Sequence, residues 1–202
     1  MAKHYQWAPL MWMFDVKNED KRRKARLVVG GHFIDSSSLP TYSSVVQKIS
    51  IRLLLLIAKE NNLNIATGDV GNACINAKVG ESVHSRSGEE WGDKSVCVLE
   101  TLKALHGLKN SGRKWLFYLG DTLRDMRFSL SRADPDLWMK SSSHHAGFDF
   151  IGTFLDDLIA VATEPLQCLE VLASKFNIRN VSDCPDFFLS SNWTNDNDKT
   201  RA

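Results

Sequence analysis

Two adjacent carboxylates, Asp156 and Asp157, stand inside an otherwise apolar stretch that runs from Phe148 to Ala162. An unpaired charge in a protein core costs roughly 2 kcal/mol or more even after relaxation, so the pair must face water, a cation or a turn. The flanking residues are rich in aromatic and β-branched types, which predicts two strands joined at the acids. A two-residue hairpin turn favours Asn-Gly or Asp-Gly because it needs positive φ angles, so turn chemistry alone does not explain this pair.

The composition is that of a globular protein with an uneven distribution of charge. The chain has 202 residues, of which 43% are hydrophobic and 24% charged, enough to form one domain or two small lobes. A formal net charge of +1 gives no overall sign of a polyanionic partner. However, six basic residues and two acids lie between Lys17 and Arg26. This segment is either a solvated turn between two strands or a patch that contacts phosphates.

Cysteine usage and the N-terminus indicate an intracellular protein, cytoplasmic or nuclear, that is not secreted. The four cysteines are widely spaced: Cys74, Cys97, Cys168 and Cys184. They form no CxxC pair and have no nearby histidines at zinc-ligand spacing, which favours a reducing compartment. The apolar group Trp7 to Phe14 is short and contains Pro9, so it is predicted to be neither a signal peptide nor a membrane span.

Hydrophobic periodicity predicts a mixture of strands and helices, an α+β fold. Strands are expected at 12–16, 24–29, 63–69, 96–99, 148–154 and 158–162. A buried helix is expected from about Ser50, which would cap it, to Asn61, and amphipathic helices are expected from Ser111 and around Pro165.

A pair of Mg²⁺ ions requires carboxylate ligands that converge on one place. The candidate ligands are Asp69, at the end of a predicted strand, and Asp156 and Asp157 in the predicted hairpin. Mg²⁺ prefers hard oxygen ligands and retains several waters, so two or three converging carboxylates suffice. Spacing alone leaves two alternatives open: exposed turn acids with no function, and a small nuclease or phosphatase that uses the same two metals.

Seven blocks occur in one order along the chain and carry more information than the acids alone. They are KARLVVGG (24–31), TYSSVV (41–46), IRLLLLIA (51–58), GDVGNA (68–73), LHGLKNSG (105–112), ADPDLWMK (133–140) and FLDD (154–157). This series resembles the reverse transcriptase of copia-type retrotransposons, from about residue 10 to residue 193. The other six blocks do not fit a small nuclease or phosphatase.

The resemblance implies a right-handed polymerase fold with a fingers lobe, an antiparallel palm sheet and flanking helices. The implied segments are 1–60 (fingers-like), 61–74 (palm strand with the first acid), 75–108 (fingers return), 109–190 (palm with the FLDD hairpin) and 191–202 (frayed tail). It also implies that the chain is truncated before the thumb and ribonuclease H domains of a parent polyprotein.

The resemblance assigns roles to particular residues. Asp69, Asp156 and the backbone carbonyl of Val70 would hold the metal, Mg²⁺ with Mn²⁺ as an alternative, and Asp157 would be the supporting acid. The residues implied to line the nucleotide site are Lys24, Arg26, Cys74 and His106. Lys24 and Arg26 would face the incoming triphosphate; otherwise they are solvated strand ends.

The chain departs from the family pattern at four places. Cys74 replaces an aromatic residue that selects deoxynucleotides, which implies poor discrimination against ribonucleotides. His106 replaces a tyrosine, and FLDD replaces YVDD. In the block that resembles a primer grip, Phe188-Leu189-Ser190, serine stands where the family has glycine, which puts primer placement in doubt.

Two functions follow. The first is template-directed nucleotidyl transfer from deoxynucleoside triphosphates to a primer 3′-hydroxyl, with an RNA or DNA template-primer as partner and no membrane. It would use Asp69, Asp156 and Asp157 in a two-metal mechanism and be impaired by truncation. The second is a non-catalytic transposon relic that binds nucleic acid weakly through residues 17–26.

Overall fold

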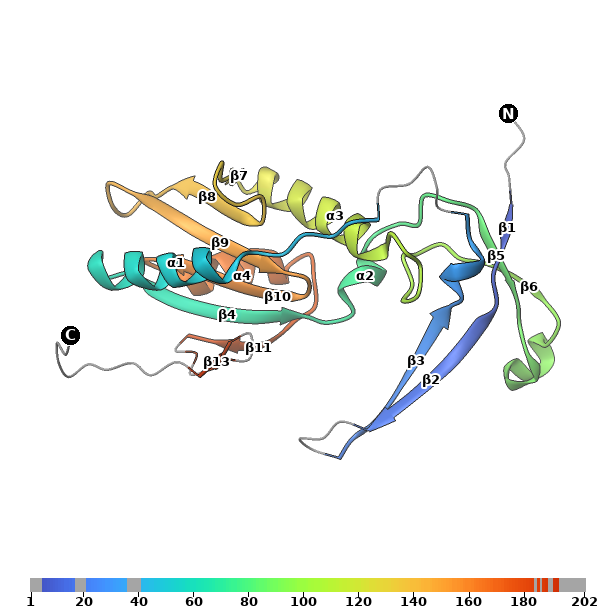
Figure 1. The fold of residues 1–202 in the computed structure, drawn as a ribbon. Coiled ribbons are helices and arrows are strands. Elements are labelled where there is room, and N and C mark those ends of the chain that lie inside the picture. The colour runs from blue at the N-terminus through green and yellow to red at the C-terminus, as the bar shows by residue number, and fades with distance from the viewer. Residues whose placement is uncertain are drawn as a thin grey trace. The chain divides into compact units, whose positions relative to one another are not determined.

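A computed structural model of the chain describes residues 5–16, 21–35, 41–183, 185, 187–188 and 191–192 (Figure 1). The chain divides into two compact units, which are described separately. Unit 1 comprises Met1–Ser43 and Asn72–Asp121, and unit 2 comprises Ser44–Gly71 and Thr122–Ala202. The predicted mixture of sheets and helices is confirmed.

The helices are α1 (Lys48–Glu60), α2 (Ala73–Asn76), α3 (Ser111–Asp125) and α4 (Pro165–Ala173), with 3-10 turns at Gly31–Phe33 and Glu89–Lys94. The strands are β1 (Gln6–Trp7), β2 (Leu10–Val16), β3 (Arg23–Val29), β4 (Asn64–Val70), β5 (Val83–Arg86), β6 (Val98–Glu100), β7 (Ser129–Leu130), β8 (Leu137–Ser141), β9 (Phe148–Phe154), β10 (Asp157–Ala162), β11 (Ile178–Ser182), β12 (Phe187–Phe188) and β13 (Ser191–Asn192).

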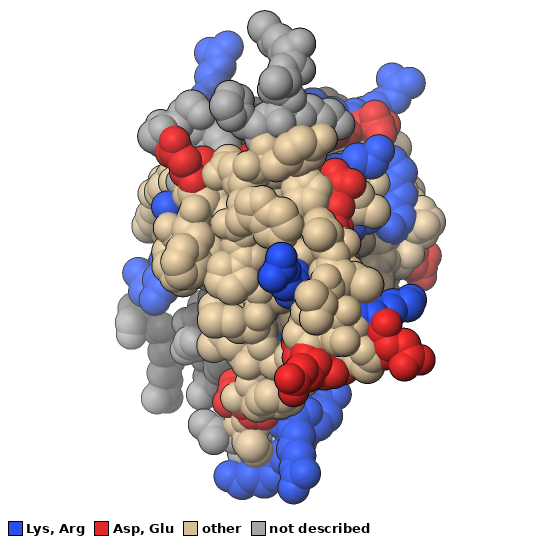
Figure 2. All heavy atoms as spheres, turned by 90° about the vertical axis from the view of Figure 1, so that its right-hand side faces the viewer, with Lys and Arg blue, Asp and Glu red and all other residues tan. Residues whose placement is uncertain are grey.

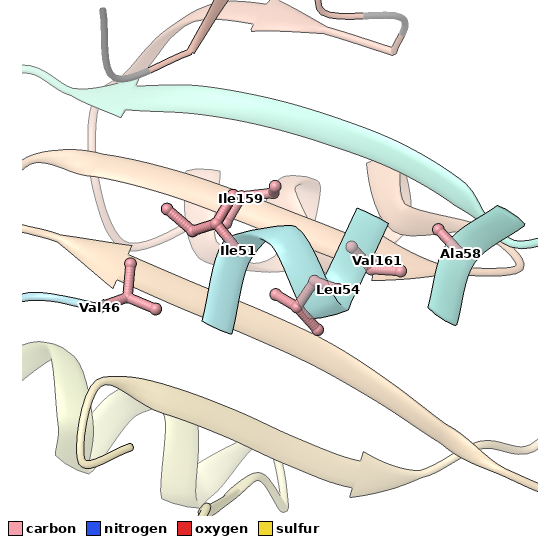
Figure 3. Packing of buried hydrophobic residues seen from close by; sticks show 6 residues of the cluster. All are labelled: Val46, Ile51, Leu54, Ala58, Ile159 and Val161. Carbon is pink, nitrogen blue, oxygen red and sulfur yellow. The ribbon is translucent and has the colours of Figure 1, made fainter. Parts of the chain in front are cut away.

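Unit 2 is built on a six-stranded sheet in the order β11-β4-β10-β9-β8-β7, and every neighbouring pair in it is antiparallel. Side chains alternate between its two faces. Ile159 and Val161 of β10 pack against Ile51 and Leu54 of α1 on one face (Figure 3). The alternate residues of β10 are also buried, and α4 contacts β4 and β10. A one-residue slip of β10 would exchange the residues on its two faces and separate Asp157 from its register partner Asp69.

A carboxylate 87 positions away in the sequence caps the N-terminus of α1. Asp134 Oδ2 accepts hydrogen bonds from the Gln47 backbone N–H at 2.9 Å and from the Ser50 hydroxyl at 2.6 Å. Asp134 Oδ1 accepts the backbone N–H of Asp136 at 3.0 Å. The prediction that Ser50 begins and caps the helix is therefore wrong. The helix begins at Lys48, and Ser50 lies inside it as a donor to the true cap.

Unit 1 contains the β2–β3 hairpin and a three-stranded sheet in the order β1-β5-β6. The hairpin is paired from Leu10 with Val29 to Val16 with Arg23. At its base, the Val29 backbone N–H donates to the His106 carbonyl oxygen at 2.8 Å. Gly107 has φ +93°, and a Cβ there would lie 2.0 Å from the Val29 carbonyl oxygen. Only glycine permits this close approach of two backbones.

The two predicted amphipathic helices bury most of their apolar positions. Trp115, Leu119 and Leu123 of α3 and Leu169 and Leu172 of α4 are each at most 1% exposed. No helix in the described part of the chain is long and apolar enough to cross a membrane. Residues 44–60 belong to unit 2, and α1 covers the sheet of that unit. The tail beyond residue 192 lies outside the described residues.

Candidate functional site

Three carboxylates meet at one end of the unit 2 sheet. Asp69 lies near the end of β4, and Asp157 is the first residue of β10. The two are direct partners in the antiparallel register, so their side chains share a face of the sheet. The carbonyl oxygen of Asp156, the residue before, accepts the backbone N–H of Val70 at 2.7 Å. Backbone pairing therefore brings together acids that are 87 and 88 positions apart.

The turn that carries the acids differs from the prediction. Strand β9 ends at Phe154 and β10 begins at Asp157, so the two turn residues are Leu155 and Asp156. Leu155 has φ +56° and is 41% exposed. A residue with a Cβ in this region costs about 1 to 2 kcal/mol, and the cost is absorbed here by the paired strands on both sides. The expectation that both acids occupy the bend is wrong, because Asp157 belongs to the sheet.

Burial and the charges of Asp156 and Asp69 raise the pKa of Asp157 from 3.8 to about 6. Burial is the largest cause, because partial removal from water disfavours the charged form. The two acidic neighbours add to the shift by repulsion. A cation bound between these groups would relieve all three effects, so the donor set fits a hard divalent metal. Within the described ranges, however, no group of three or more His, Cys, Asp or Glu side chains has a metal-binding arrangement.

A basic side chain that sequence reasoning missed lies on the other side of Asp69. Arg179 of β11 is the register partner of Asp69. A Cβ on Gly71 would lie 2.5 Å from Arg179 Nε, so the guanidinium covers this glycine. The side-chain oxygen of Asn177, in the amide orientation that satisfies both groups, accepts from Arg179 Nη2 at 2.9 Å. Strand β11 lacks clear hydrophobic alternation, and its register with β4 is irregular, so no local pattern identified Arg179.

The two predicted triphosphate-binding residues share one face of the β2–β3 hairpin. Lys24 pairs with Asp15 and Arg26 pairs with Met13, and both basic side chains are half-buried. The opposite face carries Trp12 and Phe14, which are 44% and 79% exposed. Lys21, Arg22 and Arg23 are exposed near the hairpin turn, and blue side chains gather at this end of unit 1 in Figure 2. Lys17 lies outside the described residues.

The remaining predicted residues lie in separate parts of the chain. Cys74 is half-buried in the short helix α2, and His106 lies in the loop that pairs with β3. Both belong to unit 1, whereas the three acids belong to unit 2. In the predicted primer grip, the backbone of Phe188 forms strand β12, and Leu189 and Ser190 lie outside the described residues.

Comparison with known proteins identifies the family. The model of the family described as reverse transcriptase (RNA-dependent DNA polymerase) matches residues 1–201. The Pol polyprotein of transposon TNT 1-94 from Nicotiana tabacum is 28% identical over 163 residues, which cover 76% of this chain. That of transposon RE1 from Arabidopsis thaliana is 28% identical over 184 residues, 84% of the chain. The matched regions are 12% of each relative's length. The chain thus belongs to the reverse transcriptase family, in its copia-type retrotransposon branch.

Proposed function

We propose that this chain contains the fingers and palm of a copia-type reverse transcriptase and that Asp69, Asp156 and Asp157 carry its nucleotidyl transfer. The observation that carries the proposal is the meeting of these acids at one sheet end, with the pKa of Asp157 raised to about 6 by burial and by both neighbours. A clustered acid whose pKa is shifted by burial and by neighbouring charges is typical of functional sites. The substrates would be a template-primer and deoxynucleoside triphosphates.

In this proposal, Asp69 and Asp156 hold divalent metal, with the Val70 carbonyl as a further ligand and Asp157 in support. Two bound Mg²⁺ ions, or Mn²⁺, would activate the primer 3′-hydroxyl and stabilise the departing pyrophosphate. The protein holds the acids through the pairing of β4 with β10 and through the hydrogen bond from Val70 to Asp156. Backbone pairing sets the positions of these residues, and their carboxylates would converge on the metal when it binds.

The β2–β3 hairpin would contact the phosphates of the substrates. Lys24 and Arg26 lie on one face, where they are suited to the triphosphate, with His106 in the loop that pairs with the base of the hairpin. On the other face, the exposed rings of Trp12 and Phe14 would stack on unpaired template bases. The primer would lie against residues 188–190.

Primer extension with the purified chain and Asp156→Asn tests the proposal. Loss of the carboxylate should reduce metal-dependent incorporation by about 10³-fold. Asp183→Asn is the matched control, because it removes the same charge from an exposed position in the same unit. Thermal unfolding of both variants establishes that the fold is kept. Equal incorporation by the wild type and Asp156→Asn would refute the assignment.

Substitution at residue 74 tests the nucleotide site separately. Since the Cys74 thiol is much smaller than an aromatic ring, the wild type should incorporate ribonucleotides readily, and Cys74→Phe should raise discrimination against them by about tenfold or more. The measurement is the ratio of ribonucleotide to deoxynucleotide incorporation on one template-primer. An unchanged ratio would remove Cys74 from the nucleotide site.

A non-catalytic relic is the second candidate. Two observations favour it: Cys74 stands where the family has an aromatic residue, and the described residues contain no metal-binding cluster. In that case the basic hairpin would bind nucleic acid weakly and with strong salt dependence. Salt-sensitive binding together with no incorporation at any metal concentration would select this candidate.

A further inference from the structure

Helix α1 is apolar around most of its circumference, yet the sheet covers only one side of it. Ile51, Leu54 and Ala58 are buried against β10 and its neighbours. In contrast, Ile49, Leu53 and Leu56 are 56%, 52% and 54% exposed. A helix that is hydrophobic on all sides is normally buried on all sides. The outer side of α1 therefore lacks the cover that its composition predicts.

The three exposed residues form one continuous stripe. Ile49, Leu53 and Leu56 are spaced at i, i+4 and i+7, so their side chains are neighbours along the helix surface. The helix that presents them is held in place by Asp134, which binds Gln47 and Ser50 at its N-terminus. We call this stripe the outer face of α1. It is a preformed apolar surface on an anchored element and needs no rearrangement to bind a partner.

One edge of the outer face is basic. At about 100° per residue, Lys48, Arg52 and Lys59 fall within roughly 40° of one another, all to one side of the stripe. All three are exposed. By the same geometry Glu60, the acidic residue of α1, lies at the C-terminal end of the stripe and is exposed. An apolar stripe with cations along a single edge is complementary to an amphipathic helix that carries acids along one edge.

We propose that the outer face of α1 docks an amphipathic helix of a protein partner, with its leucine-type stripe on Ile49, Leu53 and Leu56 and its acidic edge on Lys48, Arg52 and Lys59. This would be helix-on-helix packing, in which the apolar stripe of the partner helix meets the residues at i, i+4 and i+7 of α1. The matched regions are 12% of each polyprotein relative. The rest of such a polyprotein is long enough to contain the partner helix.

A second copy of this chain fits the surface poorly. In an antiparallel pair, the basic edge of one α1 faces the basic edge of the other, and like charges repel. In a parallel pair, the basic edge of one α1 faces the opposite edge of the other α1, where Ile57 lies and no acidic residue is available. A nucleic acid would satisfy the three cations, but it would leave the apolar stripe exposed to water.

Two synthetic helical peptides about four turns long test the proposal. Both carry leucine along one stripe, and one edge carries glutamate in the first peptide and lysine in the second. Fluorescence anisotropy with the full chain should show preference for the glutamate peptide. Leu53→Asp should weaken its binding by about tenfold or more. Arg52→Glu with Lys59→Glu should reverse the preference by a similar factor. Asp183→Asn is the control that should change nothing.

Several results would overturn the proposal. These are no binding of the glutamate peptide, equal binding of both peptides, or a preference that survives the double charge reversal. Self-association of the chain that Leu53→Asp abolishes would assign the face to a second copy instead. A third outcome would assign the basic edge to nucleic acid. In that case neither peptide binds, a single-stranded oligonucleotide does bind, and its binding is abolished by the charge reversal but not by Leu53→Asp. Thermal unfolding of each variant confirms that binding is compared between folded chains.

Discussion

Unit 2 contains two pairs of acids, which differ in the hydrogen-bond donors that the protein supplies to their carboxylates. Asp134 is completely buried and accepts three hydrogen bonds, two of them from the start of α1. Asp156 is exposed and Asp157 half-buried, and no side-chain hydrogen bond from another described residue reaches either carboxylate. The first pair, with Asp136, is part of the ADPD segment, and the second is part of FLDD.

This difference separates a structural acid from an acid that is available to a ligand. A buried carboxylate remains stable when protein donors replace its hydration, as they do at Asp134. The FLDD acids lack such donors and repel one another, so a cation would stabilise them. Burial raises the pKa of Asp136. The backbone carbonyl oxygen of Asp136 accepts the Thr153 N–H at 2.9 Å.

The largest effect on stability should follow from removing the cap. Asp134→Ala leaves the Gln47 N–H and the Ser50 hydroxyl without their acceptor and should lower the free energy of unfolding by about 3 kcal/mol. Urea unfolding measures this loss. Asp136→Asn is the matched control in the same segment and should cost less than about 1 kcal/mol, because its charged form is already disfavoured. If Asp134→Ala lowers the free energy of unfolding by no more than Asp136→Asn does, the structural role assigned to Asp134 would be contradicted.

A smaller effect of opposite sign is expected at Asp157. Its pKa is about 6 in the folded chain against 3.8 as the ordinary value. The neutral form therefore favours folding, and this contribution is complete below about pH 4 and lost as the pH rises through about 6. After allowance for partial exposure, Asp157→Asn should raise the free energy of unfolding by about 1 kcal/mol at about pH 8 and leave it unchanged at about pH 4. Equal changes at both pH values would contradict the repulsion among the acids.

The smallest effect is expected at the turn. Asparagine tolerates positive φ better than leucine, so Leu155→Asn should raise the free energy of unfolding by roughly 0.5 kcal/mol. Leu130→Asn, on a partly exposed strand residue in the same unit, is the control and should lower it. Destabilisation by Leu155→Asn would mean that the Leu155 side chain contributes more than the strain costs.

The sequence was informative where one local pattern decides the outcome. Enrichment in aromatic and β-branched residues predicted β9 and β10 almost to the residue, and the helical spacing of Trp115, Leu119 and Leu123 predicted α3. Ordered blocks identified the family, which spacing of three acids alone did not. These features depend on neighbours within a few positions, which a sequence displays directly.

The failures all depend on distant residues. Nothing near Ser50 indicates that Asp134 caps α1, and nothing near Asp69 indicates that Arg179 is its partner on β11. Leu155 occupies a conformation that its own type disfavours, because the pairing of β10 with both β4 and β9 fixes the turn. Tertiary structure overrides local preference most often near functional sites.

Paramagnetic broadening by Mn²⁺ tests most directly whether the two acid pairs differ in function. In the amide NMR spectrum of the full chain, Mn²⁺ should broaden signals around residues 69–70 and 155–158 and spare those around 134–136. Excess Mg²⁺ should reverse the broadening, and Asp156→Asn should abolish it while Asp183→Asn preserves it. Broadening around Asp134 instead, or no selective broadening at either pair, would contradict the assignment of the FLDD acids to metal.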